Sequence, residues 1–297
     1  MRLPDFPRHR ATRGFPTPLA LAAALACAAP LSAQEAAAPT GFTWTNTTEL
    51  SYVETGGNAS SSTLGAKLAL EGKGDPHTWR VEAGGVYASA DVRSRRAVGT
   101  PEDFELVETV RSETTAESYF ARTRYDRSLG PAFAFGGFGW ERNTFSGIRH
   151  RLSTVAGVGR TFTDGPQARF KADLGFTYTI QKDVAPAPNA DEGFGGLRAS
   201  IEARRAVSSN AQLRMDVVVD DNLEELEDVR ADVLTSLSVA ISEDLALKTS
   251  LQLLWDNQPA LINAPLESPT GTPLGATVPV VGRELDRVVT IALVITL

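Results

Sequence analysis

The chain is poor in cysteine and has no long hydrophobic run beyond its N-terminal segment. Its 297 residues include one Cys, three His and two Met. Cys27 lies in a segment that we expect to be removed on export, so disulfides, thiol catalysis and Cys-based metal sites are excluded from the mature chain. No later stretch approaches the roughly 18 uninterrupted apolar residues typical of a membrane-spanning helix.

The N-terminal segment has the pattern of a cleaved secretory signal. Basic residues precede a short apolar stretch over 19–31, and Ala33 supplies the small residue expected at a cleavage site. We predict a signal peptide over 1–33 and a periplasmic lead-in over 34–41. The surroundings of Cys27 resemble a lipoprotein signal, but the Leu usual three residues earlier is absent, which favours an ordinary signal peptide.

The chain that follows the signal is acidic. Removal of 1–33 takes away four Arg and one Asp, which leaves 25 Lys and Arg against 35 Asp and Glu, a formal net charge of −10. Such a surface argues against nucleic acid as a partner, because nucleic acids bind basic surfaces. The mean hydropathy of −0.13 is low for a membrane protein. It fits a protein in which only alternate residues contact lipid.

Alternation of apolar and polar residues dominates the rest of the chain and is clearest over 167–181. There Arg169, Lys171 and Asp173 alternate with apolar residues. The apolar set is Ala168, Phe170, Ala172, Leu174, Phe176, Tyr178 and Ile180. Because successive side chains of a strand point to opposite faces, this pattern predicts one lipid face and one polar face.

Twelve such segments predict the fold. They lie near 43–52, 64–73, 79–87, 118–127, 132–143, 148–162, 167–181, 193–205, 213–220, 229–241, 247–255 and 284–297. Tight turns are expected at 74–76, 128–131, 163–166, 208–210 and 242–244. Longer loops are expected at 56–59, 93–114, 143–147, 182–192, 221–228 and 256–282. Short and long connections that alternate are typical of a transmembrane barrel. We predict an all-β, antiparallel up-and-down transmembrane β-barrel of about twelve strands over 42–297, with its Trp and Tyr residues in girdles at the strand ends.

Several stretches resemble the YdiY-like family, outer-membrane barrels of unknown function that are named as salt-induced. The matching stretches are Glu54-Thr55-Gly56-Gly57-Asn58, Ser118-Tyr119-Phe120-Ala121, Trp140-Glu141-Arg142-Asn143-Thr144-Phe145-Ser146-Gly147 and Gly157-Val158-Gly159. The resemblance implies a barrel of this type and supplies no catalytic or binding residues. The chain departs from such barrels at Leu297, where a terminal aromatic residue is usual. In the longest stretch we expect Glu141 to pair with Arg142, Phe145 to point inward, and Gly147 to allow a tight reversal.

The polar face of the predicted barrel is rich in charges of both signs. The residues that we expect to face the lumen are Lys67, Arg80, Glu82, Arg122, Arg124, Asp126, Arg169, Lys171, Asp173, Arg198, Glu202, Arg214, Asp216, Arg230, Asp232, Lys248, Glu284 and Asp286, with Glu71 and Arg204 on the same faces. These charges could line a narrow water-filled path or neutralise one another in a closed barrel. Twelve strands are compatible with both interpretations.

We predict no catalytic residues, no cofactor and no metal site. His77 and His150 are the two histidines beyond the signal, and Ser153 is three residues from His150, so the two side chains point to opposite faces. The acidic stretch 220–228 lacks the spacing of a calcium-binding loop. Arg93, Arg95 and Arg96 could meet lipopolysaccharide phosphates or remain solvated. A hydrolase at the outer rim is the remote alternative.

The sequence therefore predicts a non-enzymatic barrel in the outer membrane of a Gram-negative bacterium. The expected role is a narrow passive channel for ions or small solutes, with a link to salt or osmotic stress. The alternative is a closed structural or stress-response barrel. The expected partners are outer-membrane lipid, lipopolysaccharide and the barrel-assembly machinery, with no nucleic acid.

Overall fold

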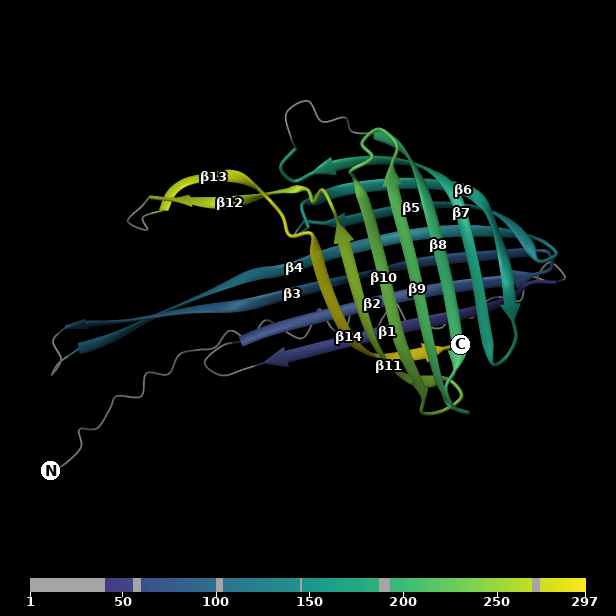
Figure 1. Cartoon of the computed structure of the whole chain (residues 1–297). Coiled ribbons are helices and arrows are strands. Elements are labelled where there is room, and N and C mark those ends of the chain that lie inside the picture. Colours follow the sequence, from purple (N-terminus) through teal and green to yellow (C-terminus); the bar gives the residue numbers. More distant parts are fainter. Residues whose placement is uncertain (1–40, 56–59, 100–103, 145, 187–192, 269–272) are drawn as a thin grey trace. The chain divides into compact units, whose positions relative to one another are not determined.

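The computed structural model describes residues 41–55, 60–99, 104–144, 146–186, 193–268 and 273–297 (Figure 1). The expected signal peptide with Cys27, the lead-in up to residue 40, the loop 56–59 and Phe145 lie outside the described residues. No helix in the described part of the chain has the length and hydropathy needed to cross a membrane.

The described residues form fourteen β-strands. Their bounds are β1 (Thr43–Thr55), β2 (Ser60–Gly74), β3 (His77–Gly99), β4 (Phe104–Leu129), β5 (Ala132–Asn143), β6 (Ile148–Asp164), β7 (Ala168–Asp183), β8 (Gly193–Ala206), β9 (Ala211–Asn222), β10 (Val229–Ala240), β11 (Leu245–Asp256), β12 (Leu261–Glu267), β13 (Pro273–Val281) and β14 (Leu285–Thr296).

Twelve of these strands close into one barrel in the order β1-β14-β11-β10-β9-β8-β7-β6-β5-β4-β3-β2 (Figure 1). Each strand pairs antiparallel with the strand that precedes or follows it around the wall. The prediction of a twelve-stranded up-and-down barrel is confirmed, and so are the five tight turns. The strands β12 and β13 pair with each other as a separate two-stranded sheet.

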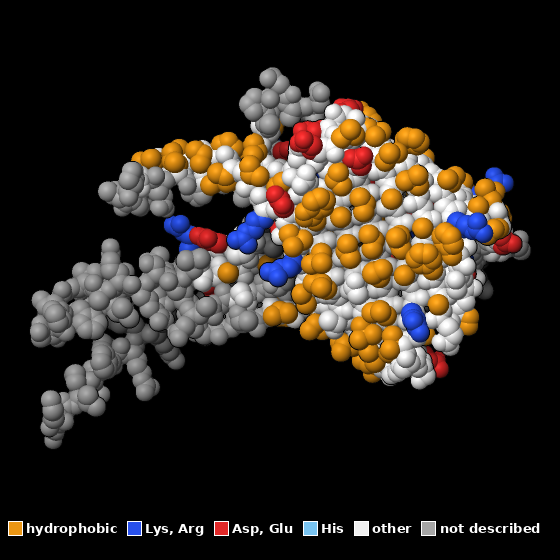
Figure 2. All heavy atoms as spheres, in the orientation of Figure 1, with side chains coloured by type: hydrophobic (Ala, Val, Ile, Leu, Met, Phe, Trp, Pro, Cys, Tyr) orange, Lys and Arg blue, Asp and Glu red, His pale blue; other side chains and the backbone are white. Residues whose placement is uncertain are grey.

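The wall is apolar outside and polar inside, the reverse of a soluble protein. On β7, Leu174 and Phe176 are 57% and 71% exposed, whereas the alternate residues Lys171 and Asp173 are buried. The buried polar residues are Glu82, Lys171, Asp173, Thr177, Thr179, Asn222, Asp228 and Ser236. In Figure 2 apolar side chains form a band over the visible wall, with charged side chains at its margins. Lipid is the solvent that suits this distribution.

Aromatic side chains lie at both ends of the strands, as predicted. At the turn end the rings of Trp79 and Tyr125 have centroids 4.8 Å apart, and a 2.6 Å hydrogen bond joins His77 Nδ1 to Tyr125 Oη. At the loop end Trp140 stacks on His150 with centroids 6.1 Å apart. Rings with a polar group prefer the interface between lipid and water, so these two zones mark the expected limits of the membrane.

Two expected loops contain paired strands, and both predictions were wrong in this respect. The stretch 93–114 belongs to β3 and β4, whose pairing continues to Gly99 opposite Phe104. The stretch 256–282 contains the hairpin of β12 and β13. Alternation reveals a strand only where its two faces meet different surroundings, and a hairpin beyond the wall meets water on both faces.

The seam between the first and last barrel strands is short. β1 and β14 share four residue pairs, from Thr47 opposite Thr296 to Leu50 opposite Leu293. Two further hydrogen bonds of 2.9 Å join the backbones of Asn46 and Leu297. Residues 51–55 of β1 pair only with β2, and residues 285–292 of β14 pair only with β11. The barrel therefore closes through its turn-side half at this seam.

A charge on the apolar wall should destabilise the barrel in lipid. Leu174→Arg places a cation in the middle of β7 on its exposed face and should cost about 2–4 kcal/mol of unfolding free energy. Denaturant unfolding from phospholipid vesicles measures this cost. Leu226→Arg, in the exposed connection between β9 and β10, is the matched control and should cost almost nothing. Equal losses for the two variants would contradict the placement of β7 in lipid.

Candidate functional site

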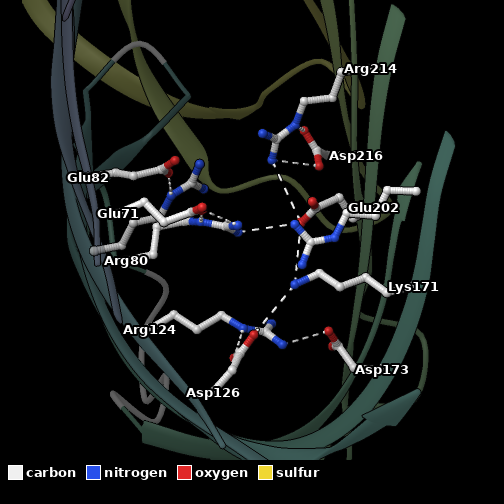
Figure 3. Close-up of polar contacts among 12 residues, drawn as sticks. Glu71, Arg80, Glu82, Arg124, Asp126, Lys171, Asp173, Glu202, Arg214 and Asp216 are labelled. Atoms are coloured by element: carbon white, nitrogen blue, oxygen red, sulfur yellow. Dashed lines mark hydrogen bonds and ion pairs between the residues drawn. The ribbon is translucent and has the colours of Figure 1, made fainter. Parts of the chain in front are cut away.

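The barrel encloses a network of charged side chains, here called the central network (Figure 3). It comprises Lys67, Glu71, Arg80, Glu82, Arg122, Arg124, Asp126, Lys171, Asp173, Glu202, Arg214 and Asp216, which are six cations and six carboxylates. Eleven of these residues were predicted at the lumen by name, and Glu71 was placed on the same face. The balance of sign leaves the network without net formal charge.

Several ion pairs of the central network cross the interior of the barrel. Arg80 Nη1 on β3 lies 3.4 Å from Glu202 Oε2 on β8. Arg124 Nη2 on β4 donates a 2.8 Å hydrogen bond to Asp173 Oδ2 on β7. Neither pair of strands is adjacent in the wall, so these contacts pass through the space that the wall encloses (Figure 3).

Glu202 is the carboxylate with the most cations around it in this network. Its Oε2 atom lies 3.4 Å from Lys171 Nζ and 3.8 Å from Arg214 Nη2, in addition to Arg80. Lys171 also reaches Asp126 Oδ2 at 3.5 Å. The side chains of Lys171 and Asp173 are only 6% and 3% exposed. These side chains therefore occupy part of the interior at this level.

Two phenylalanines fill the interior beside the network on the turn side. Phe133 and Phe135 of β5 are buried, and the guanidinium of Arg124 lies 3.9 Å from the centroid of Phe135. Lys171 Nζ lies 5.4 Å from the centroid of Phe133, so both rings can stabilise cations of the network. A Cβ atom at Gly159 would collide with the ring of Phe133, which explains why glycine stands at this point of β6.

A second group of charges lies toward the loop end. Arg151 Nη1 lies 2.7 Å from Glu141 Oε1, and Arg151 Nε donates a 2.7 Å hydrogen bond to Gln181 Oε1. Arg230 Nη1 on β10 reaches the same Gln181 oxygen on β7 at 3.4 Å. Since β7 and β10 are not neighbours, this contact also crosses the interior.

Asp228, just before β10, accepts hydrogen bonds from Arg230 of this second group. Burial raises the pKa of its carboxyl, but hydrogen bonds from Arg230 and Asn222 and the charge of Arg230 outweigh burial, so the pKa lies below its ordinary value. A lowered pKa in the folded state means that the contact stabilises the fold at neutral pH. This contribution disappears as the pH falls through the lowered pKa.

The connection between β5 and β6 crosses the loop-end mouth. Ser146 Oγ donates a 2.8 Å hydrogen bond to Asp286 Oδ2 on β14, which lies far from β5 and β6 around the wall. Gly147 has a φ of +78°, as expected for a tight reversal, and a Cβ atom there would lie 2.8 Å from Ala260 Cβ. This connection partly covers the mouth.

One expected pair in this stretch was wrong. Glu141 contacts Arg151 instead of Arg142, and Arg142 Nε lies 3.5 Å from Glu117 Oε1. Adjacent residues of a strand point to opposite faces, so Glu141 and Arg142 cannot meet.

The remaining predicted lumen residues lie in smaller contacts. Arg198 Nε lies 2.7 Å from Asp220 Oδ1, and Gln252 donates to Asp232 at 2.9 Å. Lys248 Nζ lies 2.7 Å from Glu49 Oε1, and β11 and β1 are separated by β14. Glu284 lies one residue before β14 and is exposed.

The sequence-based set of lumen residues omitted Arg151, Glu49 and the two phenylalanines. Glu49 and Arg151 carried a usable signal, because each occupies the polar face of an alternating segment. Phe133 and Phe135 carried none, because apolar residues fall on both faces of β5.

The serine and histidine at the outer rim lie apart, and the described residues hold no metal-binding cluster. His150 stacks on Trp140, while Ser146 Oγ is bonded to Asp286, so this serine and histidine are not paired. Within the described part of the chain, no group of three or more His, Cys, Asp or Glu side chains is placed to hold a metal ion.

Comparison with known protein families shows which family the chain belongs to. A family model described as "Protein of unknown function, DUF481" matches residues 48–264. The chain belongs to the DUF481 family. The "Uncharacterized protein YdiY" of Escherichia coli (strain K12) is 26% identical over 208 residues, which are 70% of this chain and 72% of that protein. The resemblance inferred from the motifs is thereby confirmed, and the DUF481 match includes the connection 143–147 at the mouth.

Solved structures similar to this DUF481 protein include an anion-selective porin from Comamonas acidovorans, with 12% identity and a TM-score of 0.38 over 86% of this chain and 99% of the porin. The translocator domain of the autotransporter NalP from Neisseria meningitidis has 12% identity and a TM-score of 0.39 over 86% and 88%. The NanC porin has 8% identity and a TM-score of 0.43 over 85% and 98%. Identities and TM-scores as low as these carry no information about function.

Removal of the central carboxylate should destabilise the fold. Glu202→Gln leaves Arg80, Lys171 and Arg214 close together without their shared anion, and should cost about 3–5 kcal/mol of unfolding free energy. Denaturant unfolding in detergent micelles measures the loss. Glu225→Gln, on an exposed loop residue, should leave the unfolding free energy unchanged. A Glu202→Gln protein as stable as the wild type would refute the central role of this carboxylate.

The covered mouth can be tested with two glycines of similar backbone conformation. Gly147 and Gly130 have φ values of +78° and +74°, so alanine should add a similar strain of about 1–2 kcal/mol at each. Only Gly147 lies against Ala260, whereas a Cβ at Gly130 meets nothing within 4 Å. Gly147→Ala should therefore lower the unfolding free energy more than Gly130→Ala. Equal losses would mean that Gly147 does not pack on Ala260.

Proposed function

We propose that this protein is a non-enzymatic outer-membrane barrel that provides a narrow passive path for ions or small solutes. The observation that carries the proposal is the central network, which places charges of both signs across the interior of a wall that is apolar outside. Charged side chains in a lumen set the sign of the ions that pass, and a narrow section limits their size. The crossing pair of Arg80 and Glu202 marks this narrow section.

The proposal includes a location and surroundings. It places the barrel in the outer membrane of a Gram-negative bacterium after export through a signal peptide cleaved near residue 33. Lipid and lipopolysaccharide would surround the apolar wall, and the barrel-assembly machinery would insert it. The apolar band of Figure 2 and the aromatic residues at both strand ends support this location. The link to salt or osmotic stress rests on the family resemblance alone.

A closed barrel is the second candidate function, and a specific observation favours it. The side chains of Lys171 and Asp173 are almost fully buried, and the network has equal numbers of positive and negative charges. Buried and neutralised charges stabilise a plug as well as they line a path. The two candidates differ in whether ions cross the barrel.

The absence of enzymatic activity is part of the proposal and has geometric support. The hydroxyl of Ser146 donates to Asp286, and His150 lies against Trp140. A hydrolase at the rim would need a histidine within hydrogen-bond reach of its nucleophile. Neither side chain is placed for that chemistry among the described residues.

Single-channel conductance of the refolded chain in planar bilayers tests the proposed path. We expect discrete steps whose ion preference depends on the network charges. Arg214→Gln removes a cation that is 40% exposed and should shift selectivity toward cations, whereas Asp216→Asn removes its partner, 25% exposed, and should shift selectivity toward anions. Opposite shifts from two paired residues on one strand cannot arise from a general loss of structure.

Arg205→Gln is the control, because Arg205 lies on the outer face of β8 and is exposed. It should leave the selectivity unchanged. A folded protein, identified by its heat-modifiable migration, that gives no steps would establish the closed barrel and overturn the proposed path. Steps with unchanged selectivity in both network variants would place any path outside the central network.

A further inference from the structure

A cavity of about 290 Å³ lies at the turn end of the barrel. Its lining includes three basic side chains, Lys73, Arg169 and Arg204, and two carboxylates, Asp75 and Asp164. The lining residues come from the turn between β2 and β3 and from the turn-side ends of β2, β3, β4, β6, β7 and β8. The cavity adjoins the turn side of the central network, because Lys73 pairs with Glu71 of that network.

Arginines stand side by side on the wall of this cavity. Arg169 on β7 is opposite Arg204 on β8, and Arg204 is opposite Arg214 on β9. Like charges directly opposite each other on neighbouring strands repel, so such a row needs anions nearby. Arg214 has Asp216 and Glu202 as its partners.

The other two arginines are poorly satisfied by the protein. Arg169 Nε is buried and has no hydrogen-bond partner, and the nearest carboxylate oxygen, Asp164 Oδ1, lies 3.6 Å away. The side chain of Arg204 makes no ion pair or hydrogen bond within the described part of the chain. Two adjacent guanidinium groups that face a cavity therefore have donor capacity that no protein acceptor uses.

We propose that this cavity binds a small free oxyanion of the phosphate type between Arg169 and Arg204. A guanidinium group presents donors in a planar fork that matches the oxygens of phosphate. Lys73, which also pairs with Glu71, adds a third positive charge, and the hydroxyl of Thr78 at the cavity wall can donate a further hydrogen bond. The neighbouring carboxylates favour an anion small enough to stay on the arginine side.

The position of the cavity favours a dissolved anion over a lipid headgroup as the bound phosphate. Arg169 and Arg204 lie on the inner face of the wall, whereas lipid contacts the outer face, on which Arg205 is exposed. Phosphate in solution reaches the cavity through the turn-end mouth. The inference concerns binding alone and holds whether or not the barrel conducts ions.

The test is the line width of the ³¹P resonance of inorganic phosphate with the refolded full chain in a phosphate-free, uncharged detergent. The wild type should broaden the resonance in a saturable way. Arg204→Gln should weaken binding about tenfold or more, because a charge-assisted donor is lost. Arg205→Gln changes the neighbouring residue on the other face and should bind as the wild type does. Lys73→Gln, at a side chain that is 55% exposed, should also weaken binding, and Glu71, the ion-pair partner of Lys73, retains its pair with Arg80.

Each possible result either supports or overturns phosphate binding at this cavity. No saturable broadening by the wild type overturns the proposal. Equal weakening by Arg204→Gln and Arg205→Gln would show diffuse attraction to basic residues, and would overturn it too. If Arg204→Gln fails to refold, unchanged binding by Lys73→Gln overturns the proposal, and weaker binding supports it. Displacement of bound phosphate by sulfate at constant ionic strength, but not by chloride, supports recognition of an oxyanion.

Discussion

The closed ladder of backbone hydrogen bonds is the constraint on which the rest of this structure depends. Lipid offers no partner to a free N–H or C=O group, so a sheet that crosses a membrane must pair every strand on both sides. Closure gives each strand one face toward lipid and one toward the interior. The apolar residues occupy the first face, and the charged residues occupy the second. Charges enclosed in this way need counter-charges inside the same wall, and the equal numbers in the central network meet that need.

Alternation in the sequence was sufficient to predict the barrel because lipid and lumen demand opposite residue types on every strand. It predicted the turns as well, since their Gly, Pro, Asn and Asp residues interrupt the pattern. It failed for the extensions of β3 and β4 and for β12 and β13. Their residues pair through the backbone, and backbone pairing leaves no trace in the composition of faces that meet the same solvent.

The sequence predicted which charged residues face the interior, but not which of them form ion pairs with each other. Alternation assigned Arg80 and Glu202 to the interior, yet their contact depends on the curvature that brings β3 near β8. The cavity at the turn end depends in the same way on register, because the alignment of Arg169 with Arg204 follows from the length of the connection between β7 and β8. A pattern within one strand carries no information on either point. Strand geometry alone excludes the expected pair of Glu141 and Arg142, because adjacent residues of a strand point to opposite faces.

The short seam has a consequence for how the protein folds. Every other backbone pairing in the barrel wall joins strands that are consecutive along the chain, except β11 and β14, which are separated only by the β12 and β13 hairpin. The pairing of Thr47 with Thr296 joins the two ends of the barrel sequence. Such a contact carries the largest loss of chain entropy and here returns few backbone hydrogen bonds. Curling of a nearly complete sheet should therefore precede its closure, and the junction of β1 with β14 should form last and separate first.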